Sequence, residues 1–450
     1  MTTINIITLG CSKNTVDSER LAGLFTQTAC KVFFDRAKND CDVVIVNTCG
    51  FIGDAKAQSV DELLQQASAK RFFNRRHARD GRCRRLVAVG CLVERYRDEL
   101  SDELPEVDAW FGVHQWDAIA AWVLDNDGLM ARFDEAERLL STPCHYAYLK
   151  ISEGCDRHCS YCAIPNIRGR HISRPIDQLV DEAKMLVRQG VKEIILIAQD
   201  TTYYGLDLYG ERRLGTLLAR LAQESGACWI RLHYTYPASF PSDAIEAMCR
   251  YDNICKYIDI PLQHISSRIL SSMRRGIDRQ GTLDLIDYFR RTIPNVSIRT
   301  TLIVGYPGET DEEFRELKDF VAQARFDRMG CFAYSPEEGT EAFRLPDTVS
   351  DEEKQHRVDE LMELQEQIAL HRNEAMLNQL FVVIIDRVED HYYVGRTQYD
   401  SPDVDDEVLI EFDDDDPKLY VGEFYKVRIV EVMEHDVFAH VVDYDPVRIH

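Results

Sequence analysis

Three cysteines lie within eight residues of one another in the run Gly154-Cys-Asp-Arg-His-Cys-Ser-Tyr-Cys, at Cys155, Cys159 and Cys162. Thiolates at this spacing can bind three corners of one cubic iron–sulfur cluster and leave the fourth iron without a protein ligand. Structural zinc sites and electron-transfer clusters normally have four protein ligands, whereas a catalytic metal centre keeps one position open. The C-x3-C-x2-C spacing therefore predicts a metal centre that does chemistry.

Two simpler interpretations fit these cysteines less well. A zinc ribbon would need two C-x2-C pairs, or histidines at a regular ligand distance, and His158 instead falls inside the motif. Three unrelated buried cysteines would have no reason to gather on one Gly-led loop.

A second set of cysteines follows three apolar runs near the N-terminus. Cys11, Cys49 and Cys91 come just after the runs 4–9, 43–46 and 86–89, and helical stretches such as 18–25 and 57–69 come next. Strands alternating with helices predict a parallel sheet, whose strands all end at one edge. The three cysteines are therefore expected to converge at the ligand crevice of that edge. The alternative is that small cysteines only fill space beside glycine turns.

The centre of the chain repeats the strand–helix pattern six times. Strand-like runs occur at 147–151, 193–198, 229–234, 257–260, 297–304 and 328–335. Such an array could form a doubly wound sheet or a partly closed barrel, and the pattern alone does not choose. The cysteine loop follows the first run, at the end of the strand where barrels carry their active sites.

A long helix is predicted from the Ser350/Glu353 capping box to about Gln379, and five short strand-like runs follow it. Five short strands suit a small barrel of the OB type. Residues 381–450 contain 19 Asp or Glu and 6 Lys or Arg, which gives 6 − 19 = −13. This module should repel RNA and attract a cationic polypeptide, unless the acidic residues only form a solvated face.

The whole chain of 450 residues carries a formal charge of −24 and 14 cysteines. With no apolar run long enough to span a membrane and no leader-like start, we expect a cytoplasmic protein with reduced thiols and no membrane partner. Residues 70–85 hold eight Lys or Arg, which could contact ribosomal RNA or form a solvated helix face.

Taken together, the motifs resemble a known family. The C-x3-C-x2-C run with Tyr161 before its last cysteine is similar to the radical S-adenosylmethionine (SAM) superfamily, and the flanking modules narrow the resemblance to the methylthiotransferases. The runs that resemble the RimO type begin at Thr8 (TLGCSKN), Tyr146 (YAYLKISEGC), Ile260 (IPLQHIS) and Tyr393 (YVGRTQYDSP).

This resemblance implies an α/β fold in three modules. They are a flavodoxin-like parallel sheet domain with the auxiliary cluster at 1–125, a partly open (βα)6 radical SAM barrel at 143–378, and a small antiparallel TRAM β-barrel, OB-like, at 379–450, with a linker at 126–142. It also implies two [4Fe-4S] clusters, SAM as cofactor, and the six cysteines of the two sets as metal ligands.

The implied reaction adds a methylthio group to the β-carbon of an aspartate on protein twelve of the small ribosomal subunit, free or on the ribosomal particle. SAM cleavage gives a 5′-deoxyadenosyl radical, a reductant protein supplies electrons, and the auxiliary cluster delivers sulfur. The related MiaB type acts on transfer RNA and tends to have a basic barrel, so the acidic barrel argues against transfer RNA as the substrate here. A non-catalytic iron–sulfur sensor or electron carrier is the other alternative.

The resemblance also suggests contacts with SAM for Tyr161, Gln199, Asp200, Gly305 and Glu309. The chain departs from the superfamily here, because Ala198-Gln199-Asp200 replaces the usual Gly-Gly-Glu, Thr301 stands where glycine is common, and Glu309 comes one position late. An ordinary turn before a capped helix would also explain Gly305 and Glu309. Because the cofactor fragment abstracts hydrogen, no side chain is named as catalytic acid or base, and His264 and Asp200 are assigned to packing or substrate positioning.

Overall fold

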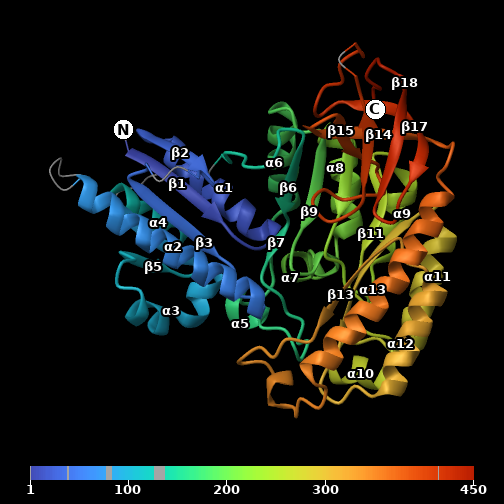
Figure 1. Ribbon diagram of the computed structural model, residues 1–450, viewed down its shortest axis with the longest axis horizontal. Coiled ribbons are helices and arrows are strands. Elements are labelled where there is room, and N and C mark those ends of the chain that lie inside the picture. Colours follow the sequence, from blue (N-terminus) through green and yellow to red (C-terminus); the bar gives the residue numbers. More distant parts are fainter. Residues whose placement is uncertain (1, 38–39, 78–83, 126–136, 414, 450) are drawn as a thin grey trace.

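The computed structural model describes residues 2–37, 40–77, 84–125, 137–413 and 415–449. Three units follow one another along the chain, with the N-terminal unit on one side of the central unit and the C-terminal barrel against another side (Figure 1). Most of the predicted linker, residues 126–136, lies outside the described residues.

The N-terminal unit is a five-stranded parallel sheet in the order β2-β1-β3-β4-β5. Its strands are β1 (Thr2–Thr8), β2 (Cys30–Phe34), β3 (Val43–Thr48), β4 (Arg85–Gly90) and β5 (Ala109–Phe111). Its helices are α1 (Ser12–Thr26), α2 (Gly53–His77), α3 (Cys91–Glu103) and α4 (Trp116–Leu124).

Side chains of this sheet alternate between two cores. Ile4 and Ile6 pack with α1 and α4, whereas Ile7 and Val44 pack with α2 and α3. The strand order is the flavodoxin-like one, in which the direction of winding reverses between β1 and β3 and leaves a crevice for a ligand there. The prediction for this domain is confirmed.

The central unit is a six-stranded parallel sheet with β6 and β13 at its two edges. Its strands are β6 (Tyr146–Lys150), β9 (Glu193–Ile197), β10 (Trp229–Leu232), β11 (Ile254–Asp259), β12 (Ser297–Val304) and β13 (Arg328–Ala333). The outer helices are α6 (Ile176–Arg188), α8 (Leu214–Glu224), α9 (Ser242–Arg250), α11 (Arg279–Thr292), α12 (Asp311–Ala324) and α13 (Asp351–Glu374). Because these strands lie in chain order across the sheet with no reversal of winding, and β6 and β13 do not pair with each other, the partly open barrel is confirmed over the doubly wound alternative.

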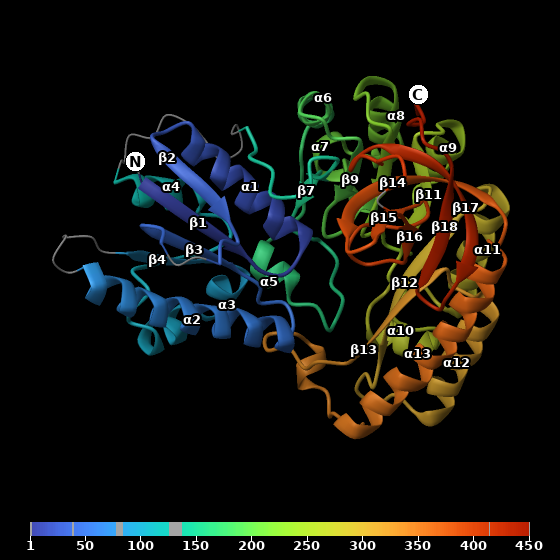
Figure 2. The ribbon, with the colours of Figure 1, turned by 45° about the horizontal axis from the view of Figure 1, so that its top comes forward.

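Shorter elements decorate the ends of these strands. They are β7 (Ser152–Glu153), β8 (Ile172–Ser173), α5 (Ile164–Arg168), α7 (Leu206–Tyr209), α10 (Ser267–Ser272) and the 3-10 turns η3 (Thr201–Tyr203) and η4 (Ala342–Arg344). In Figure 2, α5 lies between the N-terminal unit and the central unit. The segment that carries Cys155, Cys159 and Cys162 thus runs from β7 to α5.

Helix α13 ends at Glu374 and not near Gln379 as predicted. The chain turns at Asn378, which has a left-handed φ of 63° and donates its backbone N–H to Ile429 of the barrel. At the other end, Ser350 caps the helix as predicted, but the Glu353 carboxylate accepts a hydrogen bond from Arg357.

The C-terminal unit is a closed five-stranded barrel in the order β14-β15-β16-β18-β17. Its strands are β14 (Leu380–Glu389), β15 (Tyr392–Arg396), β16 (Glu407–Glu411), β17 (Phe424–Val432) and β18 (Asp436–Asp443). The small barrel is confirmed, with one difference in detail. Four of its pairings are antiparallel, but β16 and β18 are parallel, and this pair closes the barrel.

The loop between β15 and β16, residues 397–406, inserts into the amino-terminal side of the central barrel. Ser401 Oγ lies 2.9 Å from His233 Nε2, and the Tyr257 hydroxyl donates to Asp405 at 2.7 Å. Arg231 Nη1 donates to the Gln398 carbonyl at 2.9 Å. These partners lie on strands of the central sheet or directly after them, so the loop acts as a plug, and we call it the plug loop.

The predicted basic stretch is largely used inside the N-terminal unit. Lys70 is nearly buried and donates to Asp108 and to the Glu106 carbonyl, and Arg71 contacts Glu106. Arg84 is buried with its guanidinium over the Phe73 ring. Residues 78–83 of this stretch lie outside the described residues. None of the helices described in the structure is both long and apolar enough to cross a membrane.

Asp406, at the end of the plug loop, predicts a pH-dependent stability. Burial raises the pKa of Asp406 to about 7. The positive charge of Arg328 lowers this pKa, and the negative charges of Asp400 and Asp405 raise it. In the unfolded chain an aspartate has a pKa of about 3.9. Between about pH 4 and 7 the folded protein therefore keeps a proton that the unfolded chain has lost, and the free energy of unfolding falls as the pH rises.

Asp406→Asn should therefore stabilise the protein, with a gain that grows from pH 4 to 7 and reaches on the order of 2 kcal/mol at pH 8. Urea unfolding at a series of pH values measures this gain. Asp319→Asn, on the exposed face of α12, is the matched control and should have no such pH dependence. A loss of stability at pH 8 would contradict the argument.

Candidate active site

Cys11, Cys49 and Cys91 lie at the carboxyl ends of β1, β3 and β4. Gly10 has a φ of 90°, and a Cβ on it would lie 2.7 Å from Cys49 Sγ, so the turn after β1 is held against the turn after β3. A Cβ on Gly50 would likewise lie 2.9 Å from the Cys91 carbonyl carbon. The predicted convergence of these cysteines is thus observed at the crevice between β1 and β3.

Asn14, in the first turn of α1, ties the three strand ends together. Its side-chain amide donates to the carbonyls of Leu9 at 2.8 Å and Thr48 at 3.1 Å. Its Oδ1 lies 3.9 Å from Cys91 Sγ and accepts a hydrogen bond from Arg168 at 2.6 Å. Because Asn14 is fully buried, it fixes the relative positions of the cysteine turns.

Cys155, Cys159 and Cys162 form a compact loop at the carboxyl end of the first central strand. The Cys155 Sγ accepts the Arg157 backbone N–H at 3.4 Å, and the Cys162 N–H donates to the Cys159 carbonyl at 3.0 Å. Tyr161 is partly buried against the apolar cluster that includes Tyr306 and Met273.

Burial is the main influence on the pKa of most of these thiols. It raises the pKa of Cys155 and of Cys162 to about 12, and that of Cys91 to about 11. At Cys11, burial is outweighed by Lys13 and Arg168, and the pKa is lowered. Metal binding must therefore displace protons from the deeply buried thiols.

The two cysteine sets are neighbours. Cys91 packs in one apolar cluster with Ala163, the residue directly after Cys162, and with Ile167 of α5. Arg168, at the end of α5, reaches Asn14 and also Asp17 at 3.0 Å. The motif loop of the central unit is therefore joined to the cysteine crevice of the N-terminal unit.

A buried network of four charged side chains completes this junction. Arg168 and Lys150 each contact both Asp17, from α1, and Glu153, two residues before Cys155. Lys150, Asp17 and Arg168 are almost fully buried. Lys150 and Arg168 hold the pKa of Glu153 well below its usual range against the effect of burial. We call these four residues the junction network.

Both cysteine sets fit iron–sulfur clusters. Each cysteine that the structure describes is a free thiol. Within the described ranges, no three His, Cys, Asp or Glu side chains are arranged to hold one metal ion. In a cubic cluster every thiolate binds a different iron, so its ligands need not converge on one point.

The residues predicted to contact SAM make other contacts. Asp200 accepts hydrogen bonds from Arg157 at 2.7 Å and Thr202 at 2.6 Å, and Gln199 Nε2 donates to Glu153 at 3.2 Å. Glu309 is buried and contacts His264 at 3.1 Å and the Gly305 N–H.

At Gly305, a Cβ would meet Lys354 of α13 at 2.2 Å, which accounts for the glycine by packing. Glu309 also forms an ion pair with Arg357, at 3.2 Å. These contacts give Gly305 and Glu309 a structural role, as the turn before the α12 capping box of Thr310 and Glu313. Their contact with SAM stays a prediction, as do those of Tyr161, Gln199 and Asp200.

Several buried polar atoms at the mouth of the central barrel have no hydrogen-bond partner in the part of the chain that the structure describes. They are Ser152 Oγ, Arg157 Nη2, Gln199 Oε1, Gln263 Oε1 and Arg275 Nε, and they come from the cysteine loop or from segments after the strands. Ordered water or a bound polar ligand would satisfy such groups. The amino, carboxylate and hydroxyl groups of SAM fit such a set.

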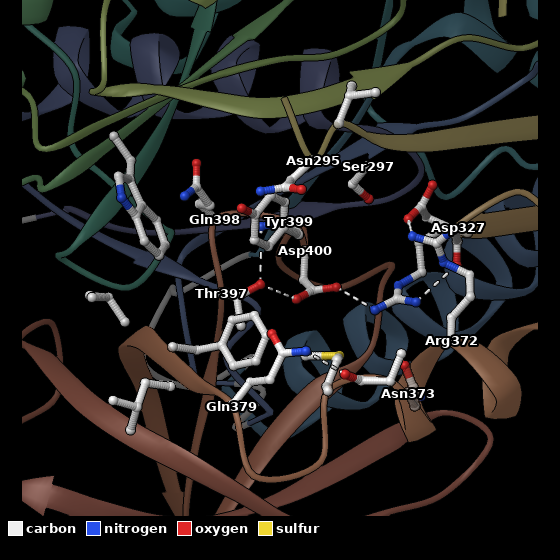
Figure 3. A pocket seen from close by; sticks show the side chains of 18 of the residues that line it. Asn295, Ser297, Asp327, Arg372, Asn373, Gln379, Thr397, Gln398, Tyr399 and Asp400 are labelled. Carbon is white, nitrogen blue, oxygen red and sulfur yellow. Dashed lines mark hydrogen bonds and ion pairs between the residues drawn. The ribbon is translucent and has the colours of Figure 1, made fainter. Parts of the chain in front are cut away.

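A cavity of about 740 Å³ between the central unit and the C-terminal barrel lies elsewhere (Figure 3). It is lined by Asn295 and Ser297 at the start of β12, Asp327 before β13, and Thr397 and Asp400 of the plug loop. It therefore opens at the amino-terminal ends of the strands, away from the cysteines. A second cavity, of about 770 Å³, is lined by Lys150, Ser152 and Glu153 and adjoins the cysteine loop.

Sequence reasoning named the six cysteines that the fold gathers into two neighbouring sets, but it missed the polar residues that surround them. Asn14 and Arg168 lie three residues after Cys11 and six after Cys162, at no recognisable spacing. Arg275 and Tyr236, which contact Cys159, lie more than seventy residues away from it in the chain. No periodicity connects such residues to the motif, so only the fold could identify them.

Comparisons with known proteins agree with this organisation. Family models match residues 3–112 (uncharacterized protein family UPF0004), 149–321 (radical SAM superfamily) and 379–442 (TRAM domain). A solved structure of the radical SAM methyltransferase TsrM from Kitasatospora setae covers 81% of this chain and 91% of its own, with a TM-score of 0.54 and 14% identity. That likeness concerns the fold alone.

Close relatives match almost the entire chain. A protein of Phocaeicola vulgatus is 51% identical over 98% of this chain and 99% of its own, and one of Flavobacterium psychrophilum is 52% identical over 97% of each. A protein of Chlorobaculum parvum is 49% identical over 97% of each. All three are named ribosomal protein uS12 methylthiotransferase RimO. With its two adjacent three-cysteine sites, its open radical SAM barrel and its TRAM barrel, the chain belongs to the RimO family of methylthiotransferases.

Proposed function

We propose that this protein transfers a methylthio group to the β-carbon of one aspartate of ribosomal protein uS12, in the cytoplasm and with electrons from a separate reductant protein. The observation that carries the proposal is that the two cysteine sets lie next to each other. Two contacts join them: Cys91 packs with Ala163, and Arg168 donates a hydrogen bond to Asn14. A sensor or electron carrier would need neither two adjacent open sites nor a substrate pocket beside them.

The chemistry requires a radical because the β-carbon of aspartate carries no hydrogen that an ordinary side-chain base could remove at neutral pH. Cys155, Cys159 and Cys162 would hold the cluster that binds SAM, which would provide the 5′-deoxyadenosyl radical, and Cys11, Cys49 and Cys91 would hold the cluster that provides the sulfur. The protein itself has to hold both sites in register and exclude water. The apolar cluster of Cys91, Ala163 and Ile167 serves the second task.

Incubation of the reduced, cluster-loaded protein with SAM and uS12 should add one methylthio group to a single aspartate, detected by mass spectrometry. Free uS12 and intact small subunits are compared as substrates, which decides the form that is modified. Cys159→Ala should abolish both 5′-deoxyadenosine and product while the iron bound by the other cysteine set remains. Modification of transfer RNA instead of uS12 would reject the proposed substrate.

The junction network predicts a separation of two activities. Arg168→Lys keeps the positive charge but cannot reach Asn14, Asp17 and Glu153 together, because lysine lacks the fork of the guanidinium. Small displacements of reacting groups are costly, so methylthiolated product per 5′-deoxyadenosine should fall about tenfold or more while SAM cleavage continues.

Arg170→Lys is the matched control for this variant. Arg170 lies on the same segment, its side chain is 89% exposed, and it pairs with Asp156 at 3.3 Å. The control should keep the original ratio of the two products. Equal losses of SAM cleavage and product in Arg168→Lys would show that the network supports folding only.

Charge supports a basic protein as the substrate. The C-terminal barrel is strongly acidic, and Asp413, Asp415 and Asp416 are exposed at the end of β16. Because the plug loop fixes this barrel at the amino-terminal side of the central strands, the acidic face would act on approach and not at the reacting carbon. An extended or ribosome-bound substrate can contact the acidic face of the barrel and the cysteine sites at the same time.

Neutralising Asp413, Asp415 and Asp416 together to asparagine should raise the KM for uS12 severalfold at low salt and leave kcat unchanged, because only long-range attraction is lost. The control neutralises exposed residues of the central unit, Glu246→Gln, Asp284→Asn and Asp287→Asn, which changes the net charge equally. If both triple variants had the same KM, the acidic run would be a solvated face only.

A further inference from the structure

Arg275 is a buried cation beside the catalytic cysteine loop. Its residue is 4% exposed, and its Nη1 lies 3.4 Å from Cys159 Sγ and 3.4 Å from the Tyr161 hydroxyl. Its Nη2 donates to the Pro261 carbonyl, and its Nε has no hydrogen-bond partner among the residues that the structure describes. The guanidinium therefore points toward the sulfur of one cluster ligand.

Unlike the other arginines at this site, Arg275 has no carboxylate partner among the described residues. Arg157 pairs with Asp200 at 2.7 Å, and Arg168 pairs with Asp17 and Glu153. The ionisable groups that act on Arg275 include the hydroxyl of Tyr161, the Cys159 and Cys162 thiols and the hydroxyl of Tyr236. A buried charge without a counter-ion is costly, so the opposite charge has to come from what the site binds.

An aromatic ring fixes the position of this cation. The guanidinium carbons of Arg275 and Arg157 lie 4.2 Å and 4.0 Å from the centre of the Tyr236 ring. The Tyr236 hydroxyl in turn donates a hydrogen bond to the Arg275 carbonyl at 2.7 Å and lies 3.9 Å from Cys159 Sγ. Cation–π contacts of this kind are strongest where water is excluded.

We propose that Arg275 is the resident counter-ion of the cluster bound by Cys155, Cys159 and Cys162, held in place by Tyr236, and that it raises the reduction potential of that cluster. A cluster with three thiolate ligands gains one negative charge on reduction, and a nearby fixed positive charge stabilises the reduced state more than the oxidised state. The hydrogen bond to Cys159 Sγ acts in the same direction. Arg275 is thus a positioning residue, and the inference rests on the cluster assigned under the proposed function.

The test is a redox titration of the full-length, cluster-loaded protein followed by electron paramagnetic resonance, with the signal that SAM perturbs assigned to this cluster. Arg275→Gln should make reduction at least tenfold less favourable, a shift of about 59 mV to more negative potential for a one-electron couple. Arg275→Lys should retain most of the original potential, and Tyr236→Leu should show an intermediate shift.

Arg274→Gln removes the same charge one residue away and is the matched control. Arg274 is 53% exposed and pairs with Glu341 at 2.7 Å, so its loss should leave the potential unchanged. A shift equal to that of Arg275→Gln would overturn the proposal by showing a general charge effect.

The cluster-free protein gives a second, independent readout. There Arg275 is a buried cation with no counter-ion, so Arg275→Gln should leave the unfolding temperature equal to or above that of the unchanged protein, while the loaded variant loses iron faster. A lower unfolding temperature without metal, combined with an unchanged potential, would make Arg275 a packing residue and reject the inference. If the unchanged protein bound no SAM-responsive cluster, the proposed function would fail first, and the two failures are thereby distinguished.

Discussion

The buried junction network of Asp17, Lys150, Glu153 and Arg168 is the constraint on which the site depends. Two acids and two bases from different units meet between the cysteine crevice of one and the cysteine loop of the other, and all but Glu153 are almost fully buried. Buried ion pairs add little net stability, because desolvation offsets their attraction, but a misaligned pair is severely penalised. The network therefore selects one relative position of the two units. A second set, in which Glu19 and Glu182 contact Arg138 and Glu182 also contacts Arg20, acts alongside it.

Much of the fold could be predicted because it depends on local patterns. Apolar runs ending in Cys11, Cys49 and Cys91 identified both a parallel sheet and the edge at which these residues meet, since strand direction alone brings such residues together. The Ser350 cap of α13 and the five short strands of the last unit were equally local. The choice between an open barrel and a doubly wound sheet was not local, and it came from the resemblance to a family.

The polar support of the site could not be predicted, because it is made by residues distant in the chain. Arg168 and Arg275 are two among many arginines in the sequence, and only the fold aims them at cysteines. At Gly305 and Glu309 the fold adds contacts that the family pattern does not show. Lys354 packs against Gly305, and Glu309 contacts His264 and Arg357. The SAM contacts suggested for these two residues stay a prediction.

The plug loop has a consequence for how this architecture can diversify. Ser401, Asp405 and Gln398 contact His233, Tyr257 and Arg231 on the floor of the central unit, so the last unit supplies part of another unit's interior. Recombination that exchanged the C-terminal segment alone between distant lineages would leave those central polar groups facing a mismatched surface. The central unit and the C-terminal barrel should therefore be inherited together. Substitutions that alter substrate recognition should accumulate on the outward strands and turns of the barrel, whereas residues 397–406 should change only together with the central-unit residues that they contact.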